Sequence, residues 1–437
     1  MKVSGFFGPT GILIKDETYK QLRATGVNHI IETGLAYTDD AISRYHVYQE
    51  LAYAQKYGMT VTVQDKRLID MADRGESITT AIVTEKTGSY DYYQSFDGLF
   101  IKDEPYSATY PSTTTDDPIT KYKSLAQAIN GAGIEGWSNV FGGSDDLFYR
   151  AKKYGYYNYL NEFVTSYDMS FLSFTYYPFW NEYTGMEDAA VETSENYFTN
   201  LALVKAAATT NGIPFRTFVQ GGEGFEYEPN GDYTEGQFKW NANIGLAFGS
   251  KAVQYFPLVH PESLKNYSNG ECASGLIDSE GTLTKFGQWA TSMNAQVAAI
   301  DDVLMNATNE GFMSTGGKAT TVAADTIQSI TMNSQYWLGI AVGDEITVTN
   351  TIHSSYAGAT VTSNDATYGA FTGCFTLEDG RHAMYIVNFS DVNDNTITVS
   401  FDGSKTASTI LNGEKETTTG TTITKTLGAG EAVLVVY

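Results

Sequence analysis

The stretch Phe96-Asp97-Gly98-Leu99-Phe100-Ile101-Lys102-Asp103-Glu104-Pro105 decides how the rest of the chain is interpreted. Residues 99–101 are apolar and typical of a short buried strand. Pro105 has no backbone N–H and disfavours helical geometry in the residue before it, so Asp103 and Glu104 are expected where this strand ends. Two adjacent acids in such a place often do no more than begin a solvated loop. In an α/β barrel, however, the carboxyl ends of the strands form the floor of the active site.

Strand-like and helix-like segments alternate on both sides of this stretch. A short β-branched or aromatic run is repeatedly followed by a longer amphipathic segment that ends near glycine. Eight such pairs occupy roughly 300 residues, the usual length of a (β/α)₈ barrel. The strand-like runs are residues 3–7, 27–31, 60–63, 99–101, 136–141, 171–177, 214–220 and 251–258. The sequence therefore predicts an α/β fold, a (β/α)₈ TIM barrel over residues 1–305.

A doubly wound open sheet is the competing fold for this alternation. That fold requires a glycine-rich phosphate loop, Gly-x-Gly-x-x-Gly, after its first strand. Residues 8–11 read Gly-Pro-Thr-Gly and do not match this pattern. The barrel is therefore favoured over the open sheet.

The character of the sequence changes after about residue 306. Thr, Ser, Val and Gly dominate, apolar and polar residues alternate, and Asp379-Gly380, Asp402-Gly403 and Asn412-Gly413 mark turns. This pattern predicts a C-terminal all-β sandwich over residues 306–437. A packing role against the barrel is favoured over carbohydrate binding, because nothing in these residues requires a ligand.

The charge of the chain argues against two classes of partner. Its 437 residues include 27 Lys and Arg against 51 Asp and Glu, a net charge of −24. Binding to nucleic acid depends on Lys and Arg that neutralise phosphates, and anionic membrane surfaces attract basic segments, so neither partner is expected. No apolar run reaches the roughly 18 residues of a membrane span. The 31 Tyr offer an apolar face together with a hydroxyl, which suits sugars, although ordinary packing explains most of them.

Cysteine and histidine usage gives no sign of a metal or of another cofactor. Cys272 and Cys374 are the only cysteines, and the sequence leaves open whether they are bonded. The five histidines show no ligand spacing, so no metal site is expected. No basic-then-apolar leader precedes the first strand. The acidic, Tyr/Ser/Thr/Asn-rich composition favours an extracellular protein whose leader has been trimmed, with a cytoplasmic location as the alternative.

The predicted strand ends carry the chemistry of carbohydrate hydrolysis. They present carboxylates, amides, Tyr hydroxyls and flat Trp faces, without a Cys nucleophile or a phosphate loop. Glycoside hydrolysis needs one carboxyl group to protonate the glycosidic oxygen and a second group that attacks or stabilises the developing oxocarbenium ion. The residues predicted to bind a carbohydrate substrate are Glu32, Asp65, Trp137, Tyr176, Tyr177, Trp180, Gln220, Tyr255 and His260.

The barrel region resembles the large (β/α)₈ clan of retaining glycoside hydrolases, particularly its bacterial β-galactosidase-like members with an added C-terminal β domain. Residues 99–105, Leu-Phe-Ile-Lys-Asp-Glu-Pro, resemble the fourth-strand motif of that clan. Residues 174–178 resemble its sixth strand, residues 218–220 its seventh strand, and residues 247–256 its seventh helix and eighth strand. The resemblance implies that Glu104 is the general acid/base.

The identity of the second catalytic group stays open in the sequence. The resemblance implies a nucleophilic Glu at the end of the seventh strand, where this chain has Gln220, with Glu223 three residues later. Flexible glycines at 221 and 222 would let the chain bend and bring Glu223 over the barrel mouth. The adjacent pair of Asp103 and Glu104 also resembles the Asp-Glu pair of substrate-assisted β-N-acetylhexosaminidases, in which the Asp orients an attacking acetamido group.

A geometric condition favours Glu223 over Asp103. Neighbouring side chains on a strand point to opposite faces, so Asp103 and Glu104 both reach the site only if the strand has already ended. Three functions therefore stay open: a retaining glycoside hydrolase, a substrate-assisted hexosaminidase, and a non-catalytic sugar-binding barrel. The sequence does not decide the sugar, the linkage, endo or exo action, or the oligomeric state.

Overall fold

The structure is a computed structural model of the chain. It describes residues 1–33, 41–105, 118–141, 155–179, 189–222, 233–259, 275–337 and 340–437.

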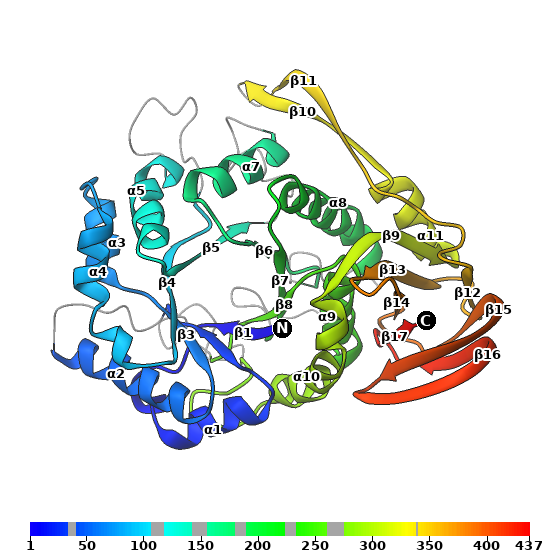
Figure 1. The fold of residues 1–437 in the computed structure, drawn as a ribbon, viewed down its shortest axis with the longest axis horizontal. Coiled ribbons are helices and arrows are strands. Elements are labelled where there is room, and N and C mark those ends of the chain that lie inside the picture. Colours follow the sequence, from blue (N-terminus) through cyan, green and yellow to red (C-terminus); the bar gives the residue numbers. More distant parts are fainter. Residues whose placement is uncertain are drawn as a thin grey trace.

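Eight parallel strands close into a barrel in which each strand pairs with the next and the eighth pairs with the first (Figure 1). The strands are β1 (Lys2–Phe6), β2 (His29–Ile31), β3 (Thr60–Val63), β4 (Phe96–Asp103), β5 (Glu135–Phe141), β6 (Leu172–Thr175), β7 (Phe215–Gln220) and β8 (Ala252–Phe256). The predicted TIM barrel is confirmed.

Helices connect the strands and cover the outside of the barrel (Figure 1). They are α1 (Asp16–Ala24), α2 (Ala41–Lys56), α3 (Lys66–Asp73), α4 (Thr80–Thr87), α5 (Pro118–Gly131), α7 (Tyr156–Tyr167), α8 (Ala189–Thr210), α9 (Glu235–Ala247) and α10 (Lys285–Leu304), with 3₁₀ turns η1 (Gly11–Leu13) and η2 (Tyr90–Tyr92). Capping residues in the sequence determine where some of these helices begin. Thr234 and Gln237 form a capping box at the start of α9, and Thr284 caps the start of α10. No helix in the described ranges is long and apolar enough to cross a membrane.

The barrel interior is a packed core. Near the N-terminal ends of the strands, Lys2 Nζ lies 2.5 Å from a carboxylate oxygen of Asp97 and 2.7 Å from one of Glu135. Further along the strands, the ring centroid of Trp137 lies 5.4 Å from that of Phe100 and 5.5 Å from that of Phe6. Because these side chains fill the barrel, a ligand site belongs at the C-terminal ends of the strands.

The C-terminal region is an antiparallel β domain, as predicted. A seven-stranded sheet has the order β12-β15-β17-β14-β13-β9, with β16 paired to β15. Its strands are β9 (Ala307–Thr315), β12 (Ala359–Ser363), β13 (Ala370–Leu377), β14 (His382–Asn388), β15 (Asn395–Leu411), β16 (Glu414–Leu427) and β17 (Ala432–Val436). Between β9 and β12 come α11 (Gly317–Thr321), the π-helical η5 (Val322–Ile327), and a separate hairpin of β10 (Ser329–Trp337) and β11 (Ile340–Thr349).

The long strand β15 lets this sheet fold over itself. Its first part pairs with β12, its last part pairs with β17, and its pairing with β16 shifts register between Ser400 and Lys405. Ile397 and Val399 from the first part of β15 share a hydrophobic cluster with Met384 of β14. The two arms of the sheet therefore pack face to face.

The other face of the central strands packs on the barrel. Tyr385 and Val387 of β14 belong to the same hydrophobic core as the barrel, whereas Met384 and Ile386 face the second cluster. The Tyr385 hydroxyl donates to Asn243 Oδ1 of α9 at 2.6 Å. Figure 1 shows α8 and α9 beside this sheet. Because both faces are covered, β14 has an apolar run in place of polar alternation.

The barrel and the β domain share this continuous core, although α10 ends at Leu304 and β9 begins at Ala307. A division into folding units at residues 305 and 306 therefore stays a prediction.

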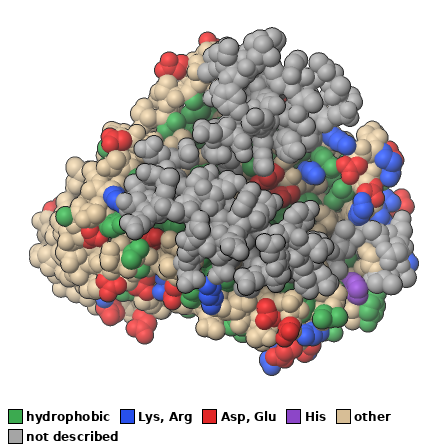
Figure 2. Space-filling model, turned by 180° about the vertical axis from the view of Figure 1, so that it is seen from behind, with side chains coloured by type: hydrophobic (Ala, Val, Ile, Leu, Met, Phe, Trp, Pro, Cys, Tyr) green, Lys and Arg blue, Asp and Glu red, His purple; other side chains and the backbone are tan. Residues whose placement is uncertain are grey.

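One face of the molecule carries side chains of both charges. Figure 2 shows Lys and Arg side chains standing among Asp and Glu side chains on the face opposite to that of Figure 1. The expectation that the chain does not bind nucleic acid stays a prediction.

Candidate active site

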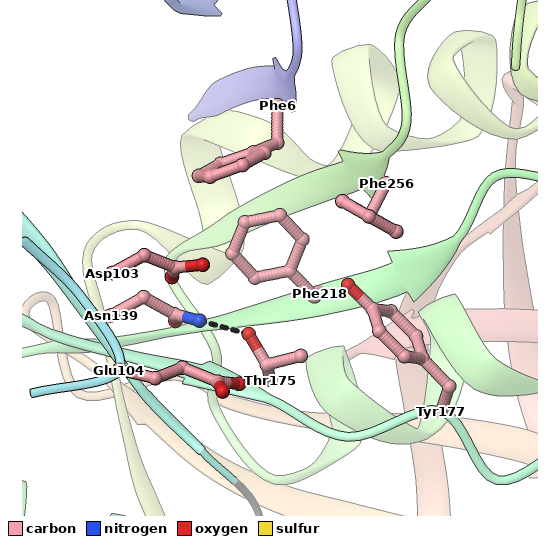
Figure 3. Close-up of a pocket in the computed structure, with 8 residues that line it drawn as sticks. All are labelled: Phe6, Asp103, Glu104, Asn139, Thr175, Tyr177, Phe218 and Phe256. Carbon is pink, nitrogen blue, oxygen red and sulfur yellow. Dashed lines mark hydrogen bonds between the residues drawn. The ribbon is translucent and has the colours of Figure 1, made fainter. Parts of the chain in front are cut away.

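A pocket of about 120 Å³ lies at the C-terminal ends of the barrel strands (Figure 3). Its walls come from six strands and from residues that follow them closely. The strands are β1, β4, β5, β6, β7 and β8. The lining residues are Phe6, Asp103, Glu104, Asn139, Thr175, Tyr177, Phe218 and Phe256. Two carboxylates therefore share one small pocket with an amide, two hydroxyls and several aromatic rings, at the place where barrel enzymes bind their substrates.

The backbone at the end of β4 brings the two carboxylates together. Asp103 is the last residue of β4, and Glu104 follows it with a φ of 43°, in the left-handed region that non-glycine residues rarely adopt. In a regular strand the two side chains would point to opposite faces. Figure 3 shows both carboxylates directed into the pocket. The regular strand has therefore ended here, as the sequence analysis required if Asp103 and Glu104 were to share a site.

The left-handed turn is held against its strain by the neighbouring strand. The Glu104 backbone N–H donates to the carbonyl oxygen of Asn139 at 3.0 Å. The pairing of β4 with β5 also shifts register between Phe100 and Lys102, just before the two acids. Backbone outliers of this kind cost about 1–3 kcal/mol each and cluster at active sites, where the surrounding structure maintains them.

A chain of hydrogen bonds fixes the polar wall of the pocket. The Asn139 side-chain amide donates to Thr175 Oγ1, the bond drawn in Figure 3, and its oxygen accepts from Ser173 Oγ at 2.9 Å. Ser173 Oγ in turn accepts from Gln254 Nε2 at 2.8 Å. Because each group has a defined partner, the orientations of Asn139 and Thr175 are set before any ligand binds.

Aromatic rings form the other wall. Tyr177 stacks on Phe256, with ring centroids 5.5 Å apart and planes 27° apart, and Phe256 lies 5.8 Å from Phe6. Burial raises the pKa of the Tyr177 hydroxyl well above its usual value of 10, and the negative charges of Asp103 and Glu104 raise it further. Tyr177 therefore keeps its proton and can donate a hydrogen bond at neutral pH.

Three predicted aromatic residues lie outside the lining of this pocket. Trp137 is fully buried and stacks on Phe100 inside the barrel. Tyr176 packs against α8, and Tyr255 donates its hydroxyl to a side chain of α10. Tyr176 and Tyr255 face the helices because alternate residues of a barrel strand point outwards.

Two predicted polar residues are engaged within the protein. Both carboxylate oxygens of Asp65 accept from the guanidinium of Arg67, at 3.0 and 2.7 Å, and one also accepts from the Tyr90 hydroxyl at 3.0 Å. The same carboxylate caps the start of α3. Gln220 donates its amide to the carbonyl oxygen of Gly222 at 3.1 Å. Neither residue lines the described pocket, and their contact with substrate stays a prediction.

Glu32 lies at the end of β2 but is only 1% exposed, and it meets a second buried carboxyl group. A Cβ placed on Gly8 would stand 2.3 Å from Glu32 Oε2 and 3.0 Å from Glu50 Oε1, so the two carboxyl groups converge there. The Tyr19 hydroxyl donates to Glu50 Oε1 at 3.3 Å. Burial raises the pKa of Glu50 well above its usual value, and the charge of Glu32 and a hydrogen bond to it raise it further.

This raised pKa predicts a specific pH dependence of stability. The folded protein keeps the Glu50 proton above its ordinary pKa of 4.5, where the unfolded chain releases it, so stability falls as pH rises towards the folded pKa. Glu50→Gln removes this titration and keeps the hydrogen-bonding shape. Urea unfolding at about pH 5 and about pH 8 should show a larger loss of stability in the wild type than in Glu50→Gln. The exposed Glu17→Gln is the control, and equal losses in Glu50→Gln and the wild type would contradict the assignment.

Three predicted site residues, Trp180, Glu223 and His260, lie outside the described residues. Sequence reasoning missed five lining residues: Phe6, Asn139, Thr175, Phe218 and Phe256. A strict period of two would have suggested Asn139 and Phe218, because each stands two residues from a candidate in the same strand. No group of three or more His, Cys, Asp or Glu within the described ranges is arranged to hold a metal ion.

Comparison with known proteins finds similarity in structure only. No family model and no curated protein matches the sequence. The fold is similar to that of a β-galactosidase from Bacillus circulans sp. alkalophilus, with a TM-score of 0.59, 9% identity, and coverage of 100% of this chain and 98% of that one. It is also similar to α-L-fucosidase isoenzyme 2 from Paenibacillus thiaminolyticus, with a TM-score of 0.52, 10% identity, and coverage of 100% and 99%.

A third similar structure is a β-galactosidase from the psychrophilic Marinomonas ef1, with a TM-score of 0.51 and 11% identity. The match covers 72% of this chain and 63% of that one. At these identities the similarity establishes the fold. The resemblance of the sequence to (β/α)₈ glycoside hydrolases is confirmed at the level of the fold.

Proposed function

We propose that the protein is a glycoside hydrolase that cleaves O-glycosidic bonds of oligo- or polysaccharides, with Glu104 as the general acid/base. The observation that carries the proposal is the convergence of Asp103 and Glu104 in one aromatic-walled pocket at the barrel mouth. Glycoside hydrolysis needs a carboxyl group at the leaving oxygen and negative charge near the developing oxocarbenium ion. The similarity in fold to the two β-galactosidases and the fucosidase supports this reaction class.

Each of the described side chains has a separate role in this reaction. Glu104 gives its proton to the glycosidic oxygen as the bond breaks, and takes a proton back from water in the second half of the reaction. The carboxylate of Asp103 stabilises positive charge on the sugar ring. The protonated hydroxyl of Tyr177 donates to a sugar oxygen, and the rings of Phe6 and Phe256 pack on apolar C–H faces of the sugar.

The retaining mechanism requires a second group at the anomeric carbon. Two carboxylates act by double displacement when they are about 5–5.5 Å apart, and they invert when about 6.5–9.5 Å separates them. Glu223 is the nucleophile that the resemblance favours. Asp103 acting through a substrate acetamido group is the competing mechanism, and the shared pocket of Asp103 and Glu104 supports it. The geometric argument against Asp103 no longer applies.

Two variants separate these mechanisms. If Glu223 is the nucleophile, Glu223→Ala should lose activity on sugars with and without an acetamido group, and azide should restore it by taking the place of the carboxylate. If the acetamido group attacks, the wild type should cleave acetamido sugars alone, Asp103→Ala should lose that activity, and Glu223→Ala should keep it without azide. The measurement is the hydrolysis of paired aryl glycosides with and without azide.

The same panel of aryl glycosides tests the proposed function itself. Release of the aryl alcohol by the wild type, slowed in Glu104→Gln when the leaving group is poor, supports a glycoside hydrolase. Binding of sugars without any release would instead favour the non-catalytic sugar-binding barrel. An extracellular location, expected from the composition, belongs to the same proposal.

A further inference from the structure

Two tyrosines at the start of α7 bind backbone carbonyls at the barrel mouth. The Tyr156 hydroxyl donates to the carbonyl oxygen of Phe141, the last residue of β5, at 2.6 Å. The Tyr159 hydroxyl donates to the carbonyl oxygen of Pro105, which directly follows Glu104, at 2.8 Å. Both side chains are buried, 3% and 1% exposed. Because they are three residues apart, they lie on the same face of the helix.

Packing holds Tyr159 in this position. Its ring centroid lies 4.9 Å from that of Phe141 and 6.0 Å from that of Tyr156, so the buried phenol packs against two rings. A phenol fixed in this way loses little freedom when its hydroxyl forms a hydrogen bond. The hydroxyl therefore acts as a rigid donor at a fixed distance from the end of β4.

The C-terminal domain anchors the start of α7 in turn. The carbonyl oxygen of Ser334 in β10 accepts from the Gly155 N–H at 3.0 Å and from Asn158 Nδ2 at 2.8 Å. Figure 1 shows the β10–β11 hairpin extending from the β domain to the side of α7. A continuous set of contacts thus links the β domain, through the first turn of α7, to the residue after Glu104.

We propose that Tyr159 is a positioning residue that maintains the left-handed turn at Glu104 and so aims its carboxyl group into the pocket. Hydrogen bonds hold this turn from both sides, through the Glu104 N–H to Asn139 and through the Pro105 carbonyl to Tyr159. A non-glycine residue with a φ of 43° leaves that conformation when its restraints are removed. The inference rests on the proposed role of Glu104 as general acid/base.

This role predicts a dependence on the leaving group. A general acid must stand within hydrogen-bond reach of the glycosidic oxygen, so its displacement slows cleavage of substrates whose leaving group needs a proton. A dinitrophenyl leaving group hardly needs that proton. The ratio of the cleavage rate of an alkyl glycoside to that of a dinitrophenyl glycoside therefore reports the placement of the acid. A general loss of stability lowers both rates alike.

Tyr159→Phe removes the hydroxyl and keeps the packed ring, and Tyr156→Phe is the matched control on the same helix face. With single-turnover kinetics, Tyr159→Phe should cleave alkyl glycosides about 10- to 100-fold more slowly than the wild type, as expected for a displaced catalytic group. Its KM and its cleavage of dinitrophenyl glycosides should stay near the wild-type values. Tyr156→Phe should keep the wild-type ratio of the two rates.

Equal slowing of both substrates by Tyr159→Phe, or no slowing of either, would overturn the inference. Glu104→Gln, measured on the same two substrates, tests the proposed function separately, because a ratio unchanged by that variant means that Glu104 is not the acid. Crystal structures of the two Tyr variants decide the positioning role in either case. The φ of Glu104 should leave the left-handed region in Tyr159→Phe and stay in it in Tyr156→Phe. An unchanged turn in Tyr159→Phe would refute the role.

Discussion

A chain that ends at Asn306 is expected to aggregate when it is expressed without the β domain. The ring of Phe248, at the end of α9, lies 4.5 Å from Phe312 and 5.6 Å from Phe371 of the β domain, measured between centroids. Trp240 of α9 donates its indole N–H to a backbone carbonyl of the same domain at 3.1 Å. Each buried ring of this size contributes about 1.5–3 kcal/mol to stability, and truncation exposes several of them together.

Size-exclusion chromatography of the truncated and complete chains, expressed in parallel, measures this effect. Phe371→Ala in the complete chain is the milder companion variant, and it should lower the free energy of unfolding by about 3–5 kcal/mol because it leaves a cavity at the interface. A soluble, monomeric truncated chain with a cooperative thermal transition would show that the barrel folds without the β domain. The division at residues 305 and 306 would then mark two independent units.

Glu104→Gln is expected to lower kcat on unactivated glycosides by about 10²- to 10⁴-fold, the usual contribution of a positioned general acid. The substitution keeps the size of the side chain and its hydrogen-bonding capacity, and removes the transferable proton. Steady-state kinetics measure the loss, and circular dichroism with thermal unfolding should show a fold like that of the wild type. The exposed Glu17→Gln serves as the control for charge. Full activity of Glu104→Gln would assign proton transfer to another group.

The fold could be predicted because its signals are local. Each barrel strand is a short apolar run that ends before a helix-like segment, and the capping sequence at Thr234 marks the start of α9 without reference to the rest of the chain. The change to period-two patterns after residue 306 separates the β domain in the same way. The covering of both faces of β14 was harder to foresee, because it depends on where β15 folds over.

The site was predicted less completely because its geometry depends on distant contacts. Asp103 and Glu104 can be recognised as acids at a strand end. The left-handed turn at Glu104 cannot be recognised in the same way, because no glycine marks it and it depends on a hydrogen bond to Asn139 in the next strand. Glu32 is a strand-end acid too, but it is buried and contacts Glu50 of α2, a residue 18 positions away in the sequence.

The sequence also does not decide which of two adjacent candidate residues lines the pocket. Tyr176 and Tyr177 are neighbours in the sequence, yet only Tyr177 lines the pocket, while Tyr176 packs outwards on α8. Which of two such residues points inwards depends on how the strand is paired with its neighbours, and the sequence of one strand does not determine that pairing. The structure decides it through the pairing of β6 with β5 and β7.

The most direct test of the central claim is the single-turnover rate of aryl glycoside cleavage by the wild type and by Glu104→Gln, measured against the pKa of the leaving group. The wild-type rate should depend weakly on that pKa, because Glu104 supplies the proton to poor leaving groups. The rate of Glu104→Gln should fall steeply as the leaving group becomes more basic, and approach the wild-type rate for dinitrophenyl glycosides. Parallel dependences for the two proteins, or no cleavage of any glycoside by the wild type, would contradict the account.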